Sequence, residues 1–248
     1  MSTLAVPTSA RPIVYPDSDG KPMAENTLQY DWIVKITGGL RRLFADDPNV
    51  FIAGDLFWYP VEGRPDIRMA PDTLVVFGRP PGHRGSYRQW VEAGIAPQIV
   101  FEVLSPGNRF GEMLAKFNFY RHYGVEEYYI YDPDRLELSG FLRQQDDLVE
   151  IEPMQGHVSP RLKVKFEMVG DGLRLTGPDG LPFETFEGIV LAEKEARRAA
   201  EEQRARAERE RNRAEQERNR AEQERNRADR LQAELERLRR ETGASGTK

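Results

Sequence analysis

Three charged residues lie where the folded chain is expected to bring them together. Glu102 stands inside an apolar segment that predicts a buried strand, Asp72 directly precedes a second such segment, and Lys116 lies in a helical pattern. A carboxylate among apolar side chains is costly unless it is paired or bound to a metal. Two acids on adjacent strands can share one hard cation, and Mg²⁺ suits few carboxylates together with water and phosphate. The combination therefore predicts a site for a divalent cation beside a phosphate.

The segment 97–132 predicts the elements that would position Glu102 and Lys116. Residues 98–105 have the composition of a strand, and alternation places Glu102 on the same face as Val100, opposite Phe101. A turn at Pro106 leads into a helix over 109–123, which Gly124 ends. A second strand is predicted over 127–131. Lys116 flanks the apolar stripe of this helix, which comprises Phe110, Met113, Phe117 and Tyr120.

The rest of the first 190 residues predicts further strands and one more helix. Asn26 and Gln29 fit an N-cap and its partner for a helix that contains Gly38-Gly39, a pair that indicates a break or the close approach of another element. Strands are expected over 49–59, which contains Asp55, and over 67–77. Later strands are expected over 136–142, 148–153 and parts of 161–186. This order predicts an α/β fold with a mixed central sheet flanked by helices.

Each of the three charged residues also has a plainer interpretation. Glu102 could pair with a structural arginine, Asp72 could serve turn chemistry after Pro71, and Lys116 could lie at the surface with its stem along the core. Only their combination favours catalysis. The test is whether the ammonium group of Lys116 reaches the two carboxylates.

Composition excludes several classes of site. The chain of 248 residues has no cysteine, so disulfides and thiolate metal sites are excluded, and its three histidines are far apart.

The sequence contains no typical signal peptide and no apolar run long enough to span a membrane, which predicts a cytoplasmic protein. Outside 192–241 there are 20 basic and 27 acidic residues, a net charge of −7. That balance is not typical of a general nucleic-acid binder.

The C-terminal part is a charged heptad repeat. Alanine recurs every seven residues from Ala207 to Ala228, and Leu235 continues the series. We expect an N-terminal arm over 1–24, a globular domain over 25–190 with a β-rich C-terminal addition, a long helix over 191–241 and a disordered tail over 242–248. An alanine seam buries little surface, so a dimeric coiled coil is expected near 228–238, the alternative being a single charged helix.

The motifs also carry a resemblance to a known family. The segments APDTLVVFG, IVFEVLSPGNR and YGVEEYYIYDPD, with Lys116 between the last two, resemble the Uma-type family of restriction endonucleases. That family belongs to the PD-(D/E)xK nuclease superfamily, and the resemblance covers roughly residues 15–145. It implies a restriction-endonuclease-like core in which Asp72 and Glu102 are metal ligands and Lys116 is the catalytic lysine. The superfamily lysine two residues after the second acid is Leu104 here, and Lys116 on the helix takes its place.

The resemblance implies an endonuclease that hydrolyses DNA phosphodiester bonds with Mg²⁺ or Mn²⁺. Glu25 is the nearest candidate for the further acid that the superfamily often adds from its first helix, and Asp55 is a possible supporting group. A homodimer formed partly through the C-terminal helix and a DNA substrate are the expected partners. The alternative is a catalytically silent nuclease fold that serves as a binding or assembly module, because a fold alone does not decide function.

Overall fold

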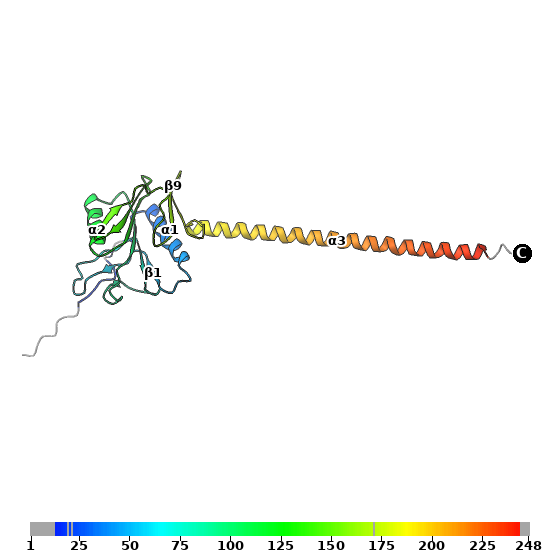
Figure 1. Ribbon diagram of the computed structural model, residues 1–248, viewed down its shortest axis with the longest axis horizontal. Helices are drawn as coiled ribbons and strands as arrows, with labels where there is room; N and C mark the ends of the chain where they lie inside the picture. The colour runs from blue at the N-terminus through cyan, green and yellow to red at the C-terminus, as the bar shows by residue number, and fades with distance from the viewer. Residues whose placement is uncertain (1–12, 19, 21, 171, 244–248) are drawn as a thin grey trace, which may run out of the picture. The chain divides into compact units, whose positions relative to one another are not determined.

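The computed structural model describes residues 13–18, 20, 22–170 and 172–243, and the chain divides into two units after Phe186. The second unit consists of a single helix, α3, over its described residues (Figure 1). The elements are α1 (Thr27–Leu43), β1 (Val50–Ala53), β2 (Trp58–Tyr59), β3 (Thr73–Phe77), β4 (Tyr87–Arg88), β5 (Ile99–Val103), α2 (Phe110–His122), β6 (Glu127–Asp132), β7 (Glu137–Gln144), β8 (Asp147–Glu150), β9 (Lys165–Val169), β10 (Gly172–Thr176) and α3 (Phe186–Gly243).

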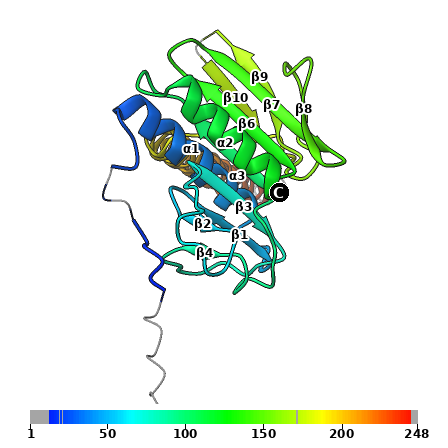
Figure 2. The ribbon, with the colours of Figure 1, turned by 90° about the vertical axis from the view of Figure 1, so that its left-hand side faces the viewer.

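A six-stranded mixed sheet forms the centre of the first unit, in the order β1-β3-β5-β6-β7-β8. Strands β5 and β6 run parallel and are joined through α2, whereas the other neighbouring pairs of this sheet are antiparallel. Figure 2 labels β1, β3, β6, β7 and β8 of this sheet. The predicted α/β fold with a mixed central sheet is thereby confirmed. Thr73 of β3 pairs with Phe101 of β5, so one residue further on Asp72 stands across from Glu102.

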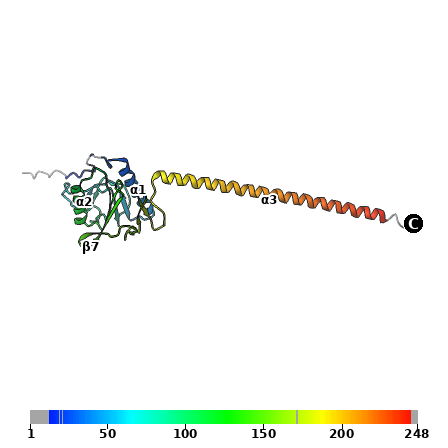
Figure 3. The same ribbon diagram turned by 90° about the horizontal axis from the view of Figure 1, so that it is seen from above.

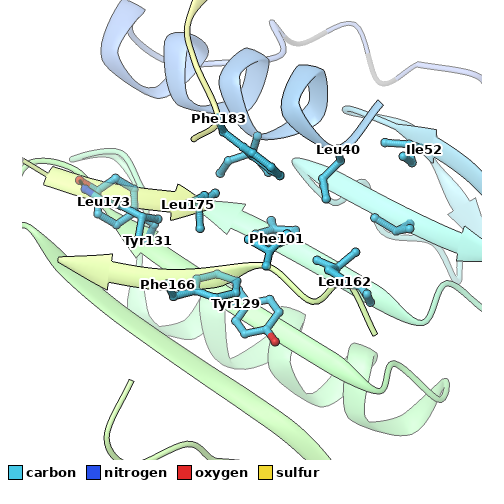
Figure 4. Packing of buried hydrophobic residues seen from close by; sticks show 14 of the residues in the cluster. Leu40, Ile52, Phe101, Tyr129, Tyr131, Leu162, Phe166, Leu173, Leu175 and Phe183 are labelled. Atoms are coloured by element: carbon cyan, nitrogen blue, oxygen red, sulfur yellow. Dashed lines mark hydrogen bonds between the residues drawn. The ribbon is translucent and has the colours of Figure 1, made fainter. Parts of the chain in front are cut away.

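The two faces of β5 contribute to two different hydrophobic cores. Phe101 packs with α1, β9 and β10, and Figure 4 shows it between Leu40 of α1 and Phe166 of β9. Val100 belongs to the other core, which contains Tyr120 of α2. Figure 3 labels α1 and α2, the helices that contribute to these two cores. The predicted alternation along β5 is therefore confirmed, and Glu102 lies on the face that α2 covers.

Three local predictions are corrected by the structure. The expected strand over 49–59 is two strands, and Asp55 lies in the turn between them with a φ of 47°, so its predicted place on a strand is wrong. The strand expected over 67–77 begins only at Thr73, although Met69 still pairs with Trp58. Phe110, the first residue of α2, is 84% exposed and is not part of the core that contains Phe117 and Tyr120.

The two glycines in α1 have different surroundings, and the helix does not break at them. A Cβ on Gly39 would overlap the buried Phe183 ring, whereas one on Gly38 would meet nothing within 4 Å. We expect Gly39→Ala to destabilise the first unit by about 1–3 kcal/mol through overpacking. Gly38→Ala is the matched control and should stabilise it by up to about 1 kcal/mol. Denaturant unfolding measures both, and equal effects would contradict the close approach of Phe183.

Helix α3 begins at Phe186, a few residues before the expected start, and intrahelical pairs such as Arg213–Glu217 at 3.3 Å lie along it. Leu231 and Leu235 are exposed. A dimeric coiled coil that residues 228–238 would form with a second copy of the chain stays a prediction. The first twelve residues of the expected arm and residues 244–248 of the expected tail lie outside the described residues. None of the helices described is both long and apolar enough to cross a membrane.

Candidate active site

The two predicted acids meet at the junction of β3 and β5. Asp72 is 8% exposed and Glu102 is 1% exposed, so both carboxylates are removed from water. The backbone N–H of Val103 donates to Asp72 Oδ2 at 2.7 Å. This bond fixes the Asp72 carboxylate against the end of β5, where Glu102 directly precedes Val103.

The ammonium group of Lys116 reaches Glu102 from α2. Its Nζ donates to Glu102 Oε2 at 2.7 Å, and the Tyr120 hydroxyl donates to Oε1 at 2.5 Å. Lys116 and Tyr120 are four residues apart and thus neighbours on one face of the helix. Each oxygen of Glu102 has a donor from the same helix face, so the plane of this carboxylate is fixed.

The charges at this site act strongly on one another. Burial raises the pKa of Asp72 well above its usual value, and the negative charge of Glu102 raises it further, against the opposing effect of Lys116. Burial lowers the pKa of Lys116, but Glu102 and Asp72 together raise it to about 12. Lys116 is therefore protonated at neutral pH. Two buried acids interact with one partly buried ammonium group, which pairs directly with Glu102. The three residues together carry one net negative charge when both acids are ionised.

A cleft of about 270 Å³ opens at this cluster. Asp72 and Lys116 line it, and so do Glu25 and Asp55, the two predicted accessory acids. Glu25 accepts from Ser105 Oγ at 2.6 Å, and a Cβ on Gly107 would overlap its carboxylate. The structure thus brings both accessory acids into the same cleft as Asp72 and Lys116.

Several lining or supporting residues were not predicted from the sequence. Asn26 caps α1 as expected, because its Oδ1 accepts from the backbone N–H of Gln29 at 2.8 Å. The Nε2 of Gln29 donates to the Val103 carbonyl oxygen at 2.8 Å and so ties α1 to β5. Tyr120 could have been found from its spacing of four residues from Lys116. Arg68 and Asn108 carry no comparable signal, because each reaches the cleft from an irregular segment.

The donor set fits a hard divalent cation held by few protein ligands. No group of three or more His, Cys, Asp or Glu side chains within the described part of the chain is arranged to bind a metal. Mg²⁺ commonly uses one or two carboxylates and completes its shell with water and phosphate. Asp72 and Glu102 supply two acids whose mutual repulsion a cation would relieve, so the residues present fit such an ion.

Two comparisons with known proteins found similarities to this chain. The crystal structure of "a putative nuclease belonging to DUF820" from Anabaena variabilis is similar to this chain, with 14% identity and a TM-score of 0.40 over 60% of this chain and 84% of that one. No curated protein matches. The family model "Uma2: Putative restriction endonuclease" matches residues 22–170. Because that match spans more than half of the chain, the protein belongs to the Uma2 family.

Proposed function

We propose that this protein is a metal-dependent endonuclease that hydrolyses phosphodiester bonds of DNA. Asp72 and Glu102 would hold Mg²⁺ or Mn²⁺, and Lys116 would orient the attacking water or the phosphate. The observation that carries the proposal is the buried pair of acids with Lys116 Nζ 2.7 Å from Glu102 Oε2. The description of the Uma2 family, "Putative restriction endonuclease", supports the same class of reaction.

Lys116 acts as a cation in this proposal and not as a base. Its pKa of about 12 keeps it protonated at neutral pH, so it has no lone pair with which to accept a proton from water. A protonated lysine can donate hydrogen bonds to a phosphate oxygen or to water. Its role is then to stabilise negative charge as the phosphodiester is attacked.

The remaining contacts hold the two acids in fixed positions before substrate arrives. Tyr120 and Lys116 orient Glu102, and the Val103 N–H group orients Asp72. Preorganised groups of this kind need no rearrangement during the reaction. The metal, when bound, supplies Lewis-acid chemistry at the phosphate and eases deprotonation of water.

Cleavage of supercoiled plasmid and linear DNA by the purified chain tests the proposal. We expect nicking or cutting with Mg²⁺ or Mn²⁺ and none with EDTA, and we expect either ion to raise the melting temperature. RNA of matched sequence serves as the comparison substrate. A chain that cuts no nucleic acid and is not stabilised by either ion would instead be a catalytically silent binding module.

A further inference from the structure

The cleft that Asp72 and Lys116 line has an excess of negative side chains. Its acidic side chains are Glu25, Asp55, Asp72 and Glu112. Its basic side chains are Lys116 and Arg68. A phosphodiester is an anion, so a cleft with this balance repels it unless cations inside the cleft are directed at it. If the proposed function holds, a divalent cation at Asp72 and Glu102 offsets part of this negative charge, and a cationic side chain directed at the backbone phosphate offsets more of it.

Lys116 is poorly placed to supply all of that contact. Its side chain is 14% exposed and already forms a 2.7 Å ion pair with Glu102. The negative charge of Asp72 also acts on it. Most of the positive charge of Lys116 thus offsets the two buried acids. Arg68 is the other basic side chain that lines the cleft and can contact a phosphate.

Arg68 is half-buried and held at the cleft wall. Its Nη1 donates to the Pro65 carbonyl oxygen at 3.0 Å, and its guanidinium carbon lies 4.9 Å from the centre of the buried Phe57 ring. A guanidinium has five N–H donors in a planar fork, of which the bond to Pro65 uses one and a hydrogen bond to the Tyr59 hydroxyl uses another. Stacking on the ring and bonding to the backbone restrict the side chain, so little further freedom is lost when it binds an anion.

We propose that Arg68 binds a backbone phosphate of the nucleic-acid substrate in this cleft, close to the bond that is cut. This proposal rests on the proposed function and adds the residue that recognises the substrate's phosphate. The fork of a guanidinium matches two oxygens of one phosphate, which an ammonium group cannot do. The contact is made to the backbone and carries no base specificity.

The contact is tested by the binding of a fluorescent DNA duplex to the full chain in Ca²⁺, followed by anisotropy at several salt concentrations. We expect Arg68→Ala to weaken binding about tenfold or more and to make the salt slope less negative by about one. Arg68→Lys should restore the salt slope, because it keeps the charge, but only part of the affinity. Arg64→Ala is the matched control, since Arg64 is exposed and pairs with Asp66 at 2.6 Å. It should leave both quantities unchanged.

The outcomes separate the two proposals. Wild-type protein that cuts DNA, together with an Arg68→Ala variant that binds with wild-type affinity and salt slope, overturns the role of Arg68 alone. Wild-type protein that neither binds nor cuts any nucleic acid overturns the proposed function and this contact with it. Melting temperatures of both arginine variants show whether a loss of binding reflects unfolding, and Arg68→Lys keeps most of the side-chain packing on Phe57.

Discussion

Replacing Lys116 by methionine should lower the rate of DNA cleavage by about 10²–10³-fold. That is the effect of removing one preorganised group that stabilises developing charge in a hydrolytic site. Methionine keeps an unbranched stem of similar length, so the packing of α2 is largely retained while the ammonium group is lost. Single-turnover cleavage of plasmid DNA at saturating Mg²⁺ measures the chemical step without contributions from product release.

The same substitution should also destabilise the metal-free protein. Glu102 is 1% exposed, and without Lys116 it keeps the Tyr120 hydroxyl as a donor but has lost its ion-pair partner. Removing one partner of a buried ion pair costs about 3–5 kcal/mol. A divalent cation on the two acids would replace the lost charge, so the deficit should shrink when Mg²⁺ is added. Denaturant unfolding with EDTA and with Mg²⁺ measures this difference.

Arg121→Met is the matched control, because Arg121 lies on the same helix and is 45% exposed in its ion pair with Asp147. It should change cleavage and stability little, since exposed pairs contribute about 0–1 kcal/mol. If the Lys116→Met protein cuts DNA at the wild-type rate, Lys116 is not part of the catalytic site. Equal stability losses in EDTA and in Mg²⁺ would argue against a metal at Asp72 and Glu102.

The acids and the lysine could be predicted because regular structure positions them. Alternation along a strand fixes the face on which Glu102 lies, and the burial of that strand makes an unpaired carboxylate improbable. Lys116 lies fourteen residues later in a helix that returns over the same face. Local periodicity on each element was therefore enough to suggest that the three residues converge. The register of β3 with β5, which periodicity does not predict, places Asp72 across from Glu102.

The parts of the site that were missed depend on irregular backbone. Arg68 lies between β2 and β3, in a segment that contains turns and one isolated bridge, Trp58 with Met69, but no regular strand or helix. Asp55 was expected on a strand, but the backbone turns there with a positive φ that is uncommon for a non-glycine residue. No periodicity describes such segments, so their side chains can be placed only once the whole fold is known.

Replacing Asp72 by asparagine should abolish cleavage and yet stabilise the metal-free protein. Asparagine has nearly the same shape, its oxygen can still accept from the Val103 N–H group, and its amide can donate to Glu102. The repulsion between two buried acids would disappear, as would a metal ligand. Stability gains at sites strained for function are commonly about 0.5–2 kcal/mol. For a chain of this size that corresponds to a rise of a few degrees in melting temperature.

The stability gain should depend on pH in a defined direction. Folding raises the pKa of Asp72, so the folded protein retains a proton that the unfolded chain releases once the pH exceeds the usual aspartate value of about 4. The free energy of unfolding of the wild type therefore falls as the pH rises from there through the raised pKa. The asparagine variant lacks this titration, so its advantage should vanish below about pH 4 and grow toward neutral pH.

Adding metal should reverse the order of stability of the two proteins. A ligand that binds only the folded state at 100 times its dissociation constant adds about 2.7 kcal/mol, and the wild type alone retains both acids. Thermal unfolding in EDTA and in Mg²⁺ or Mn²⁺, with Asp66→Asn as the control for losing an exposed carboxylate, compares the two. If Asp72→Asn were stabilised by the metal as much as the wild type, Asp72 would not be a ligand. If it were less stable than the wild type in EDTA at neutral pH, the repulsion inferred between Asp72 and Glu102 would be wrong.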